Sequence, residues 1–211
     1  MWLMDDGRAG FRAQTIGLGA AIAQKLAAMT DADTPQIISK TLPAATWTAK
    51  IFPTMAAAYA APSVAENENP PDMIIACGSA AVVPALAARR RYGAFVAYVQ
   101  RPPVAAALFD AVVCGYHDRL SGDNVLPIIG SVGGIHATDL ARRRAAARQK
   151  FATVPPPYIA VLVGGENRAF ALTPSDCQNL AAQLRAVAGG LLITTSRRTG
   201  MANIAALTDA F

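Results

Sequence analysis

The sequence predicts an α/β protein in which short parallel strands alternate with helices. Continuous apolar runs such as Ala94–Val99 and Ile159–Val163 have the length of buried strands. Alanine-rich segments of helical composition separate these runs, and glycine-rich turns lie between several strands and the helices that follow them. Strands that are apolar throughout, with helices between them, are typical of a parallel sheet covered on both faces.

The first predicted domain spans residues 1–153. Its predicted strands are Trp2–Met4, Gln36–Thr41, Asp72–Ala76, Ala94–Val99, Asp110–Cys114 and Val125–Ile129. Its predicted helices are Ala13–Ala28, Thr46–Tyr59 with a break at Pro53, Ser79–Arg91 and Thr138–Phe151. Thr138 is the predicted N-cap of the last helix, and residues 64–71 are predicted to form a loop.

Three consecutive prolines, Pro155–Pro157, follow the last of these helices. They fix an extended backbone and exclude both a helix and a central strand, so we expect a domain boundary here. The second predicted domain spans residues 157–211. Its predicted strands and helices are, in order, Tyr158–Val163, Pro174–Val187 with Thr173 as N-cap, Leu191–Thr194 and Met201–Phe211.

The composition indicates a globular protein with a substantial core. Of the 211 residues, 53% are hydrophobic and only 16% are charged, which excludes intrinsic disorder. No apolar run reaches the roughly 18 residues of a membrane span. The N-terminus has acidic residues where a signal peptide would be basic, so we expect a cytoplasmic protein.

The cysteines and histidines do not predict a metal or cofactor site. Cys77, Cys114 and Cys177 are far apart and form no CxxC pair, and there are only two histidines. Cys77 and Cys114 end apolar runs, so we expect buried free thiols. We expect no bound metal and no cofactor.

The positive charge is arginine-rich and unevenly distributed. The net charge is +5, with 15 arginines against 4 lysines, and the planar guanidinium suits phosphate and carboxylate groups. Two runs, Arg89–Arg91 and Arg142–Arg144, fall on or near predicted helices. They are either solvated helix faces or a surface that is attracted to an anionic membrane. No aromatic residues are interleaved with them, so we do not expect nucleic-acid binding.

Five turns that follow predicted strands carry residues able to bind an anion or move a proton. Their candidate residues are Asp6, Gly7, Arg8 and Gly10 with Gln14; Gln100 and Arg101; His117 and Asp118; Gly164, Gly165, Asn167 and Arg168; and Ser196, Arg197 and Arg198. Ligands of parallel sheets bind at the carboxyl ends of the strands, where these turns lie. Each turn also has a purely structural interpretation as a tight or capped loop.

The first and third turns differ in the chemistry they offer. Gly7 and Gly10 allow close backbone approach, and a helix N-terminus offers free N–H groups to an anion. This turn lacks GxGxxG, and the acidic residue expected at the usual spacing after it is also missing, which argues against an NAD-type dehydrogenase or epimerase. It also lacks the Walker lysine of a P-loop. His117 has a carboxylate neighbour, Asp118, that could orient it as a proton acceptor.

Taken in order, these turns resemble those of the "elongated mitochondria" family of mitochondrial fission proteins. The bacterial members of that family carry the names of glycosyltransferases or nucleoside-diphosphate-sugar epimerases. The motifs that carry the resemblance are Asp6-Gly7-Arg8-Ala9-Gly10, the segment from Pro71 to Gly78, Tyr116-His117-Asp118-Arg119-Leu120, Val161-Leu162-Val163-Gly164-Gly165 and the segment from Leu192 to Thr199.

The resemblance implies a GT-B-like architecture, in which two Rossmann-like domains face each other across a cleft. The N-terminal half would hold an acceptor of the cell-envelope type, and the C-terminal half would bind a nucleotide-sugar as co-substrate. Gly7 and Gly10 would then lie on the cleft floor, and the Gly164–Arg168 and Ser196–Arg198 turns would face the donor diphosphate. Asp6 and His117 both remain candidates for the general base.

Two features depart from the family pattern. Phe11 stands where relatives often have a polar residue, and the chain stops at Phe211 where the family normally continues. We therefore expect a partial, C-terminally incomplete second Rossmann-like domain, exposed apolar surface and a tendency to form homo-oligomers. The alternative function is a non-catalytic interaction protein, because plant relatives are associated with recruiting the dynamin-like fission machinery.

Overall fold

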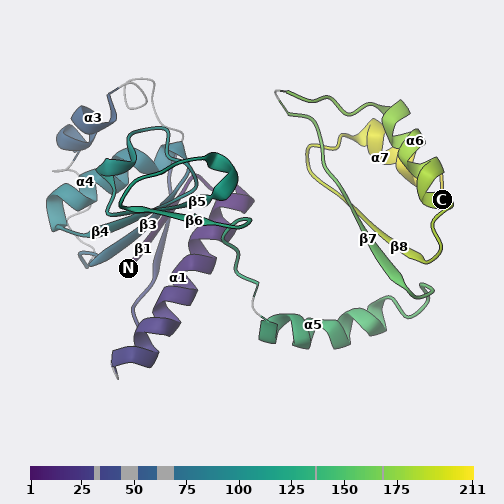
Figure 1. Ribbon diagram of the computed structural model, residues 1–211, viewed down its shortest axis with the longest axis horizontal. Coiled ribbons are helices and arrows are strands. Elements are labelled where there is room, and N and C mark those ends of the chain that lie inside the picture. Colours follow the sequence, from purple (N-terminus) through teal and green to yellow (C-terminus); the bar gives the residue numbers. More distant parts are fainter. Residues whose placement is uncertain (31–33, 44–51, 61–68, 136, 168) are drawn as a thin grey trace. The chain divides into compact units, whose positions relative to one another are not determined.

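The computed structural model describes residues 1–211 except 31–33, 44–51, 61–68, 136 and 168. The chain forms two compact units, which comprise residues 1–136 and 137–211 (Figure 1). The predicted α/β class is confirmed, because every strand pair within each unit is parallel and helices connect most of the strands. The domain boundary at Pro155–Pro157 stays a prediction.

The first unit is built on a six-stranded parallel sheet with the order β2-β1-β3-β4-β5-β6. Its strands are β1 (Trp2–Asp5), β2 (Ile38–Thr41), β3 (Met73–Cys77), β4 (Phe95–Val99), β5 (Ala111–Gly115) and β6 (Val125–Ile128). Each begins within two residues of its predicted position. The match follows from the apolar runs, since the central strands β1, β3 and β4 are almost fully buried.

Helices cover both faces of this sheet. The helices among the described residues of the unit are α1 (Ala9–Thr30), α3 (Pro53–Ala60) and α4 (Val82–Tyr92), with 3₁₀ turns at Ser79–Ala81, Ala106–Leu108 and Tyr116–Asp118. Side chains alternate along each strand, so Trp2 and Ile74 pack under α4 while Leu3 and Ile75 pack under α1. These two apolar layers form the core of the unit.

The first helix corrects one sequence-based expectation. α1 begins at Ala9 and not at Ala13, so Gly10 lies inside the helix and not in the turn. The reason is that the turn closes early, with the Arg12 N–H already donating to the Arg8 carbonyl. A Cβ added at Gly10 would meet nothing within 4 Å, so no close approach requires glycine there.

The predicted helix Thr46–Tyr59 lies partly outside the described residues, and α3 begins at Pro53, a position that suits proline.

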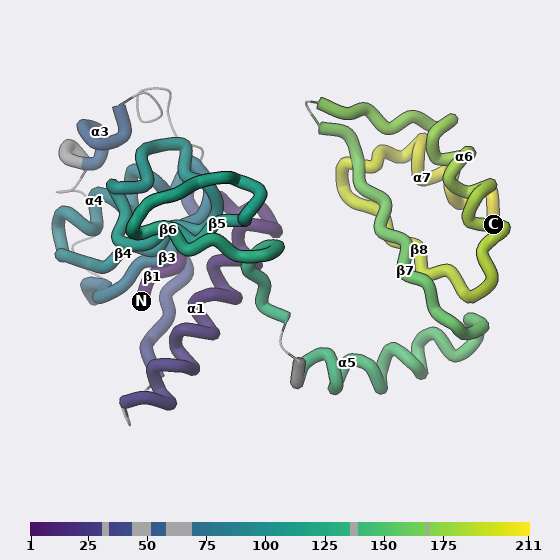
Figure 2. The backbone as a smooth tube through the Cα atoms, in the orientation of Figure 1, coloured from purple at the N-terminus to yellow at the C-terminus, as the bar shows by residue number. Residues whose placement is uncertain are grey.

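The second unit contains a two-stranded parallel sheet. Its elements are α5 (Ala137–Lys150), β7 (Tyr158–Val163), α6 (Pro174–Arg185), β8 (Gly190–Thr195) and α7 (Met201–Thr208). β7 and β8 run side by side along their whole length (Figure 2). Val163, Cys177, Ala181 and Leu207 form the core between this sheet and helices α6 and α7.

The helix ends of this unit were predicted with mixed success. Thr173 is confirmed as the N-cap of α6, because its hydroxyl accepts the Asp176 N–H at 3.2 Å while the Asp176 carboxylate accepts the Thr173 N–H at 2.9 Å. The N-cap role of Thr138 is wrong, because α5 already begins at Ala137. α7 ends at Thr208, before the predicted end at Phe211, since the last backbone N–H groups bond three residues back instead of four.

Candidate functional site

The sheet order of the first unit has a reversal between β1 and β3. The chain moves from β1 to β2 on one side and then returns past β1 to β3 and onward to β6. In parallel α/β sheets, ligands bind outside the carboxyl ends of the strands next to such a reversal. The turn that follows β1 and the turns that follow β4 and β5 carry the predicted site residues at this edge.

A buried carboxylate shapes the turn after β1. Asp5 is 2% exposed, and its carboxylate accepts the Gly7 N–H at 2.7 Å and the Thr15 hydroxyl at 3.4 Å. Gly7 has a φ of +78°, in the region that favours glycine, and an added Cβ would lie 3.0 Å from the Thr41 methyl group. The prediction that Gly7 permits this turn is therefore supported by its backbone. Sequence reasoning missed Asp5 as a candidate residue, although it directly follows the predicted strand Trp2–Met4.

Asp6 is held in a tight ion pair. Its Oδ2 accepts hydrogen bonds from Arg8 Nε at 2.8 Å and Nη2 at 2.5 Å. These hydrogen bonds lower the pKa of Asp6 and raise that of Arg8. A carboxylate with a lowered pKa is a weak proton acceptor. The Asp6–Arg8 pair therefore suits a positioning role better than proton transfer.

The Phe11 ring lies between the Arg8 side chain and Gly78, next to the point where the strand order reverses. The Arg8 guanidinium lies 4.0 Å above its ring, and a Cβ added at Gly78 would come within 2.7 Å of the same ring. Gly78 has a φ of +90°, so both the backbone and the neighbouring ring favour glycine at this position. The departure from the family pattern at Phe11 thus has a structural role, because the ring packs against Gly78 at the end of β3 and against the apolar cluster under α1.

Next to this turn lies a cavity of about 320 Å³ at the carboxyl ends of β4, β5 and β6. It brings together five of the predicted site residues, which come from α1 and from the turns after β4 and β5. They are Gln14, Gln100, Arg101, His117 and Asp118. Ser131 also lines the cavity and was missed, although its position just beyond the sixth strand could have indicated it.

Gln100 carries backbone strain at the wall of this cavity. Its φ is +79°, a conformation that costs a non-glycine residue about 1–3 kcal/mol. Its N–H donates to the Val113 carbonyl at 2.7 Å, and its side-chain Nε2 donates to Gln14 Oε1 at 3.2 Å. These two hydrogen bonds offset the strain and point the Gln100 amide toward α1.

His117 lies at the rim of the same cavity. Its side chain is 76% exposed, and its Nε2 is 3.9 Å from Asp118 Oδ1. The ring lies over Gly115, where an added Cβ would be 2.2 Å from Cε1, so only glycine leaves room for it. Asp118 is fixed on two sides: Oδ2 accepts the Gly115 N–H at 3.1 Å, and its carbonyl accepts Arg101 Nη1 at 2.9 Å.

A buried thiol forms part of the cavity wall. Cys114 lines the cavity, and burial raises its pKa, so it is a protonated and unreactive thiol at neutral pH. Cys77, at the end of β3, behaves in the same way, with burial raising its pKa to about 12. The expectation of buried free thiols is confirmed for Cys77 and Cys114, and Cys177 is a buried free thiol as well.

In the second unit, the turns after β7 and β8 interlock. The buried Thr199 hydroxyl donates to the Gly164 carbonyl at 2.7 Å, and the Glu166 N–H donates to the Arg198 carbonyl at 3.2 Å. A Cβ at Gly165 would lie 2.1 Å from the Arg198 carbonyl carbon, so the two backbones meet only because residue 165 is glycine. This contact fixes the Ser196–Arg198 turn against Gly164 and Gly165.

A cavity of about 330 Å³ opens beside these turns at the first turn of α7. Arg198 and Glu166 both line it, Arg197 precedes Arg198 in the same turn, and neither arginine forms an ion pair with a described residue. The first N–H groups of a helix have no intrahelical acceptor and carry positive partial charge. The Arg198 side chain and these N–H groups therefore lie at one cavity, beyond the carboxyl end of β8.

Asn203 is a polar side chain that sequence reasoning missed at this cavity. It is 6% exposed, and its Nδ2 donates to the Leu172 and Thr199 carbonyls, both at 2.7 Å. Its Oδ1 has no hydrogen-bond partner among the described residues. The helical pattern of residues 201–208 concealed it, because an asparagine in a first turn is also an ordinary helix residue.

The family of the chain follows from its sequence over almost its whole length. The model of the family described as mitochondrial fission ELM1 matches residues 9–211. The chain belongs to the mitochondrial fission ELM1 family. The resemblance drawn from the turns is thereby confirmed, and the match spans both units of the structure.

Among solved structures, this ELM1-family chain is similar to the crystal structure of Acinetobacter baumannii MurG, with a TM-score of 0.46 and 13% sequence identity. The match covers 99% of this chain but 62% of the MurG chain. No curated protein matches the sequence.

Two predicted site residues of this ELM1-family chain remain, Asn167 and Arg168. Asn167 Oδ1 accepts the N–H groups of Ala169 and Phe170 at 2.8 and 3.0 Å, which shapes the loop after β7. Arg168 lies outside the described residues.

Among the residues that are described, no helix is long and apolar enough to cross a membrane, and no cluster of His, Cys, Asp or Glu could hold a metal ion.

Proposed function

We propose that this ELM1-family chain acts as a glycosyltransferase-like protein whose second unit binds the diphosphate of a nucleotide-sugar. The observation that carries the proposal is the cavity beside α7, where Arg198, which follows Arg197 in the chain, lies with the free N–H groups of the first helical turn. A diphosphate is a compact anion, and guanidinium groups and helix N-termini are the groups that bind it best. The unpartnered Asn203 Oδ1 would accept a donor group of the nucleotide.

In the transfer that we propose, the acceptor hydroxyl oxygen attacks the anomeric carbon of the sugar. The bond between that carbon and the diphosphate oxygen breaks, the hydroxyl proton passes to a base, and the nucleoside diphosphate leaves with the negative charge. Arg197 and Arg198 would stabilise that charge as it develops. The chain spans about three fifths of the MurG length, so the whole activity, its sugar and its envelope-type acceptor are proposals.

His117 is the better candidate for the base of this reaction. An imidazole at the rim of a cavity can reach an incoming hydroxyl, whereas the Asp6 carboxylate is engaged by Arg8 and has a lowered pKa. We expect His117→Gln to reduce sugar transfer or donor hydrolysis at least a hundredfold, while donor affinity stays within twofold. Asp6→Asn should reduce turnover less, and the opposite ranking of the two variants would assign the base to Asp6.

Calorimetric titration with adenosine, guanosine and uridine diphosphates tests the diphosphate site. We expect at least one of them to bind, and the double variant Arg197→Ala/Arg198→Ala to weaken that binding at least tenfold, because two charge-assisted hydrogen bonds are lost. Arg143→Ala is the matched control, since it removes an exposed arginine elsewhere in the same unit. Failure of all three nucleotides to bind would contradict the proposal.

A non-catalytic interaction protein is the second candidate. The family name refers to mitochondrial fission, and α5 exposes most of its length, including the arginines of the second run. Such a helix could contact an acidic partner surface. Co-sedimentation with an assembled dynamin-like GTPase, combined with no nucleoside diphosphate binding, would favour this function over sugar transfer.

A further inference from the structure

The second unit has another cavity, at the amino end of β7 and away from the turns that carry the candidate site. Its volume is about 590 Å³, and it lies between the last turns of α5 and the β7–β8 sheet. Its lining side chains are of two kinds, arginine on one side and apolar or aromatic groups on the other, and they include Arg144, Arg148, Phe151, Tyr158 and Leu192. None of the described residues that line it is acidic.

Two arginines of α5 bring positive charge to this cavity. Arg144 and Arg148 are four residues apart, so they lie on the same face of the helix. Both are exposed, and neither forms an ion pair or a hydrogen bond with a described residue. Two guanidinium groups at one cavity favour a ligand with a phosphate or carboxylate group.

The other arginines of the same run differ from these two. Arg142 is paired with Asp139 at 2.8 Å, and Arg143 does not line the cavity. The cavity therefore receives only part of the charge of α5, from the one helix face that carries Arg144 and Arg148. This division provides a matched control within a single helix.

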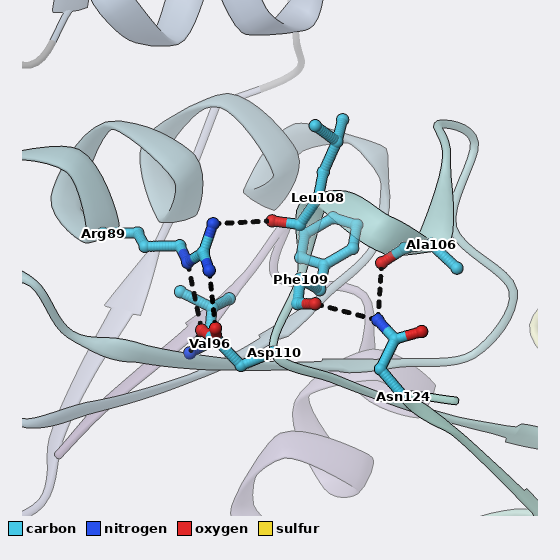
Figure 3. Close-up of polar contacts among 7 residues, drawn as sticks. All are labelled: Arg89, Val96, Ala106, Leu108, Phe109, Asp110 and Asn124. Carbon is cyan, nitrogen blue, oxygen red and sulfur yellow. Dashed lines mark hydrogen bonds and ion pairs between the residues drawn. The ribbon is translucent and has the colours of Figure 1, made fainter. Parts of the chain in front are cut away.

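Arg89 on α4 shows how the fold satisfies an arginine that has a structural role. Its Nε and Nη2 donate to the Asp110 carboxylate at 3.1 and 2.6 Å, and its Nη1 donates to the Leu108 carbonyl (Figure 3). Asp110 also accepts the Val96 N–H at 2.8 Å, so the network fixes the end of α4 against β4 and β5. The two cavity arginines of α5 have no such carboxylate among the described residues, and their charge is available to a ligand.

The wall opposite the arginines is apolar and continues beyond the cavity. The Tyr158 hydroxyl donates to the Phe151 carbonyl at 3.2 Å, which joins the chain after α5 to β7. Tyr158, Ala160 and Leu162 share one face of β7, and Ala160 pairs with Leu192 of β8. Tyr158 is 42% and Leu162 80% exposed, whereas the other face of this sheet packs against α6 and α7. An apolar strip, made of Tyr158, Ala160, Leu162 and Leu192, therefore runs from the cavity along the sheet for about 13 Å, at about 3.3 Å per residue.

We propose that this cavity binds an anionic amphiphile, a molecule with one phosphate or carboxylate head group on an apolar chain. The head group binds Arg144 and Arg148 through charge-assisted hydrogen bonds. The chain lies against Tyr158 and along the apolar strip, where it removes apolar surface from water. The proposal does not depend on nucleotide binding at α7.

A nucleotide fits this cavity less well than an amphiphile. Its base and ribose carry N–H and O–H donors, but no carboxylate or amide side chain lines the cavity among the described residues. A donor that is buried without an acceptor costs about 1–3 kcal/mol. Inorganic phosphate would bind the arginines but would leave the apolar strip in contact with water.

Calorimetric titration of the full chain with dodecyl phosphate, kept below its critical micelle concentration, tests the proposal. We expect saturable binding of one molecule per chain, and binding of butyl phosphate at least tenfold weaker, because most of the apolar chain is missing. Leu162→Ser should reduce the difference between the two phosphates. Dodecanoate should also bind, but more weakly, since a phosphate has three terminal oxygens for the two guanidinium groups. Tighter binding of dodecanoate would support the same site and assign a fatty acid as its ligand.

The double variant Arg144→Gln/Arg148→Gln should weaken dodecyl phosphate binding at least tenfold, with an unaltered circular dichroism spectrum. Arg143→Gln is the matched control and should change binding by less than twofold, as should Arg197→Ala/Arg198→Ala at the proposed diphosphate site. The proposal is overturned if neither amphiphile binds, if Arg143→Gln weakens binding as much as the double variant, or if the uncharged dodecyl maltoside binds as tightly as dodecyl phosphate.

Discussion

At the scale of single residues, the glycines after β7 show how closely two turns can meet. A Cβ at Gly165 would lie 2.1 Å from the Arg198 carbonyl carbon, whereas one at Gly164 would meet nothing within 4 Å. We therefore expect Gly165→Ala to destabilise the second unit by about 1–3 kcal/mol, because the backbone of Arg198 must move. Gly164→Ala should be neutral or slightly stabilising.

Hydrogen exchange of the β7 and β8 amides, followed by mass spectrometry, measures this difference. Gly165→Ala should accelerate exchange about tenfold or more, and Gly164→Ala should leave it nearly unchanged. Equal exchange in the two variants would show that the two turns are not locked together by this contact. Gly165→Ala should also weaken diphosphate binding, because Arg198 is displaced.

The residue scale also shows what sequence alone could and could not predict about the site. The residue types at strand ends predicted Gln100, Arg101, His117 and Asp118, and these four line one cavity. The ion pair that engages Asp6 could not be predicted, because it depends on the direction of the Arg8 side chain two residues away. The same limit applies to the left-handed backbone of Gln100, which depends on hydrogen bonds to β5 and α1.

At the scale of elements, the Arg89–Asp110 pair joins the end of α4 to the start of β5. Burial alone would raise the pKa of Asp110, but the hydrogen bonds from Arg89 and the Val96 N–H outweigh it and lower that pKa. A lowered pKa in the folded state means that the pair stabilises the fold above about pH 4. That stabilisation is lost as the pH falls through the lower folded pKa.

Acid unfolding measures this contribution. Trp2 is 1% exposed in the core of the first unit, so its fluorescence follows the unfolding of that unit. We expect Asp110→Asn to unfold at lower urea concentration at pH 7 and to lose less stability than the unaltered chain between pH 5 and pH 2. The Asp6–Arg8 pair stays in both proteins and adds the same acid dependence. An unchanged acid dependence in the variant would contradict this account.

The elements themselves were largely predictable, and their exact ends were not. Buried strands such as Met73–Cys77 and Phe95–Val99 are apolar throughout, so composition alone located them. The residue at which a helix starts depends on the side-chain and backbone hydrogen bonds of only one or two residues. Thr173 followed by Asp176 is a recognisable capping box, whereas Ala9 and Ala137 begin their helices with residues that carry no such signal.

At the scale of the whole molecule, two compact α/β units each present a turn-rich edge at the carboxyl ends of their strands. The alternation of apolar strands and helices predicted this class, and the ordered set of turns predicted the family. The strand order β2-β1-β3-β4-β5-β6 could not be predicted, because strand pairing depends on contacts between distant segments. That order places the turn after β1 beside the reversal of the sheet.

The central claim is that the second unit binds a nucleoside diphosphate at the first turn of α7. Backbone NMR spectra of the full chain, recorded during titration with the diphosphates of adenosine, guanosine and uridine, test it most directly. We expect one nucleotide to shift the amide signals of Gly164, Gly165 and Ser196–Asn203 in a saturable way. Saturable shifts confined to the first unit, or no shifts with any of the three nucleotides, would contradict the claim.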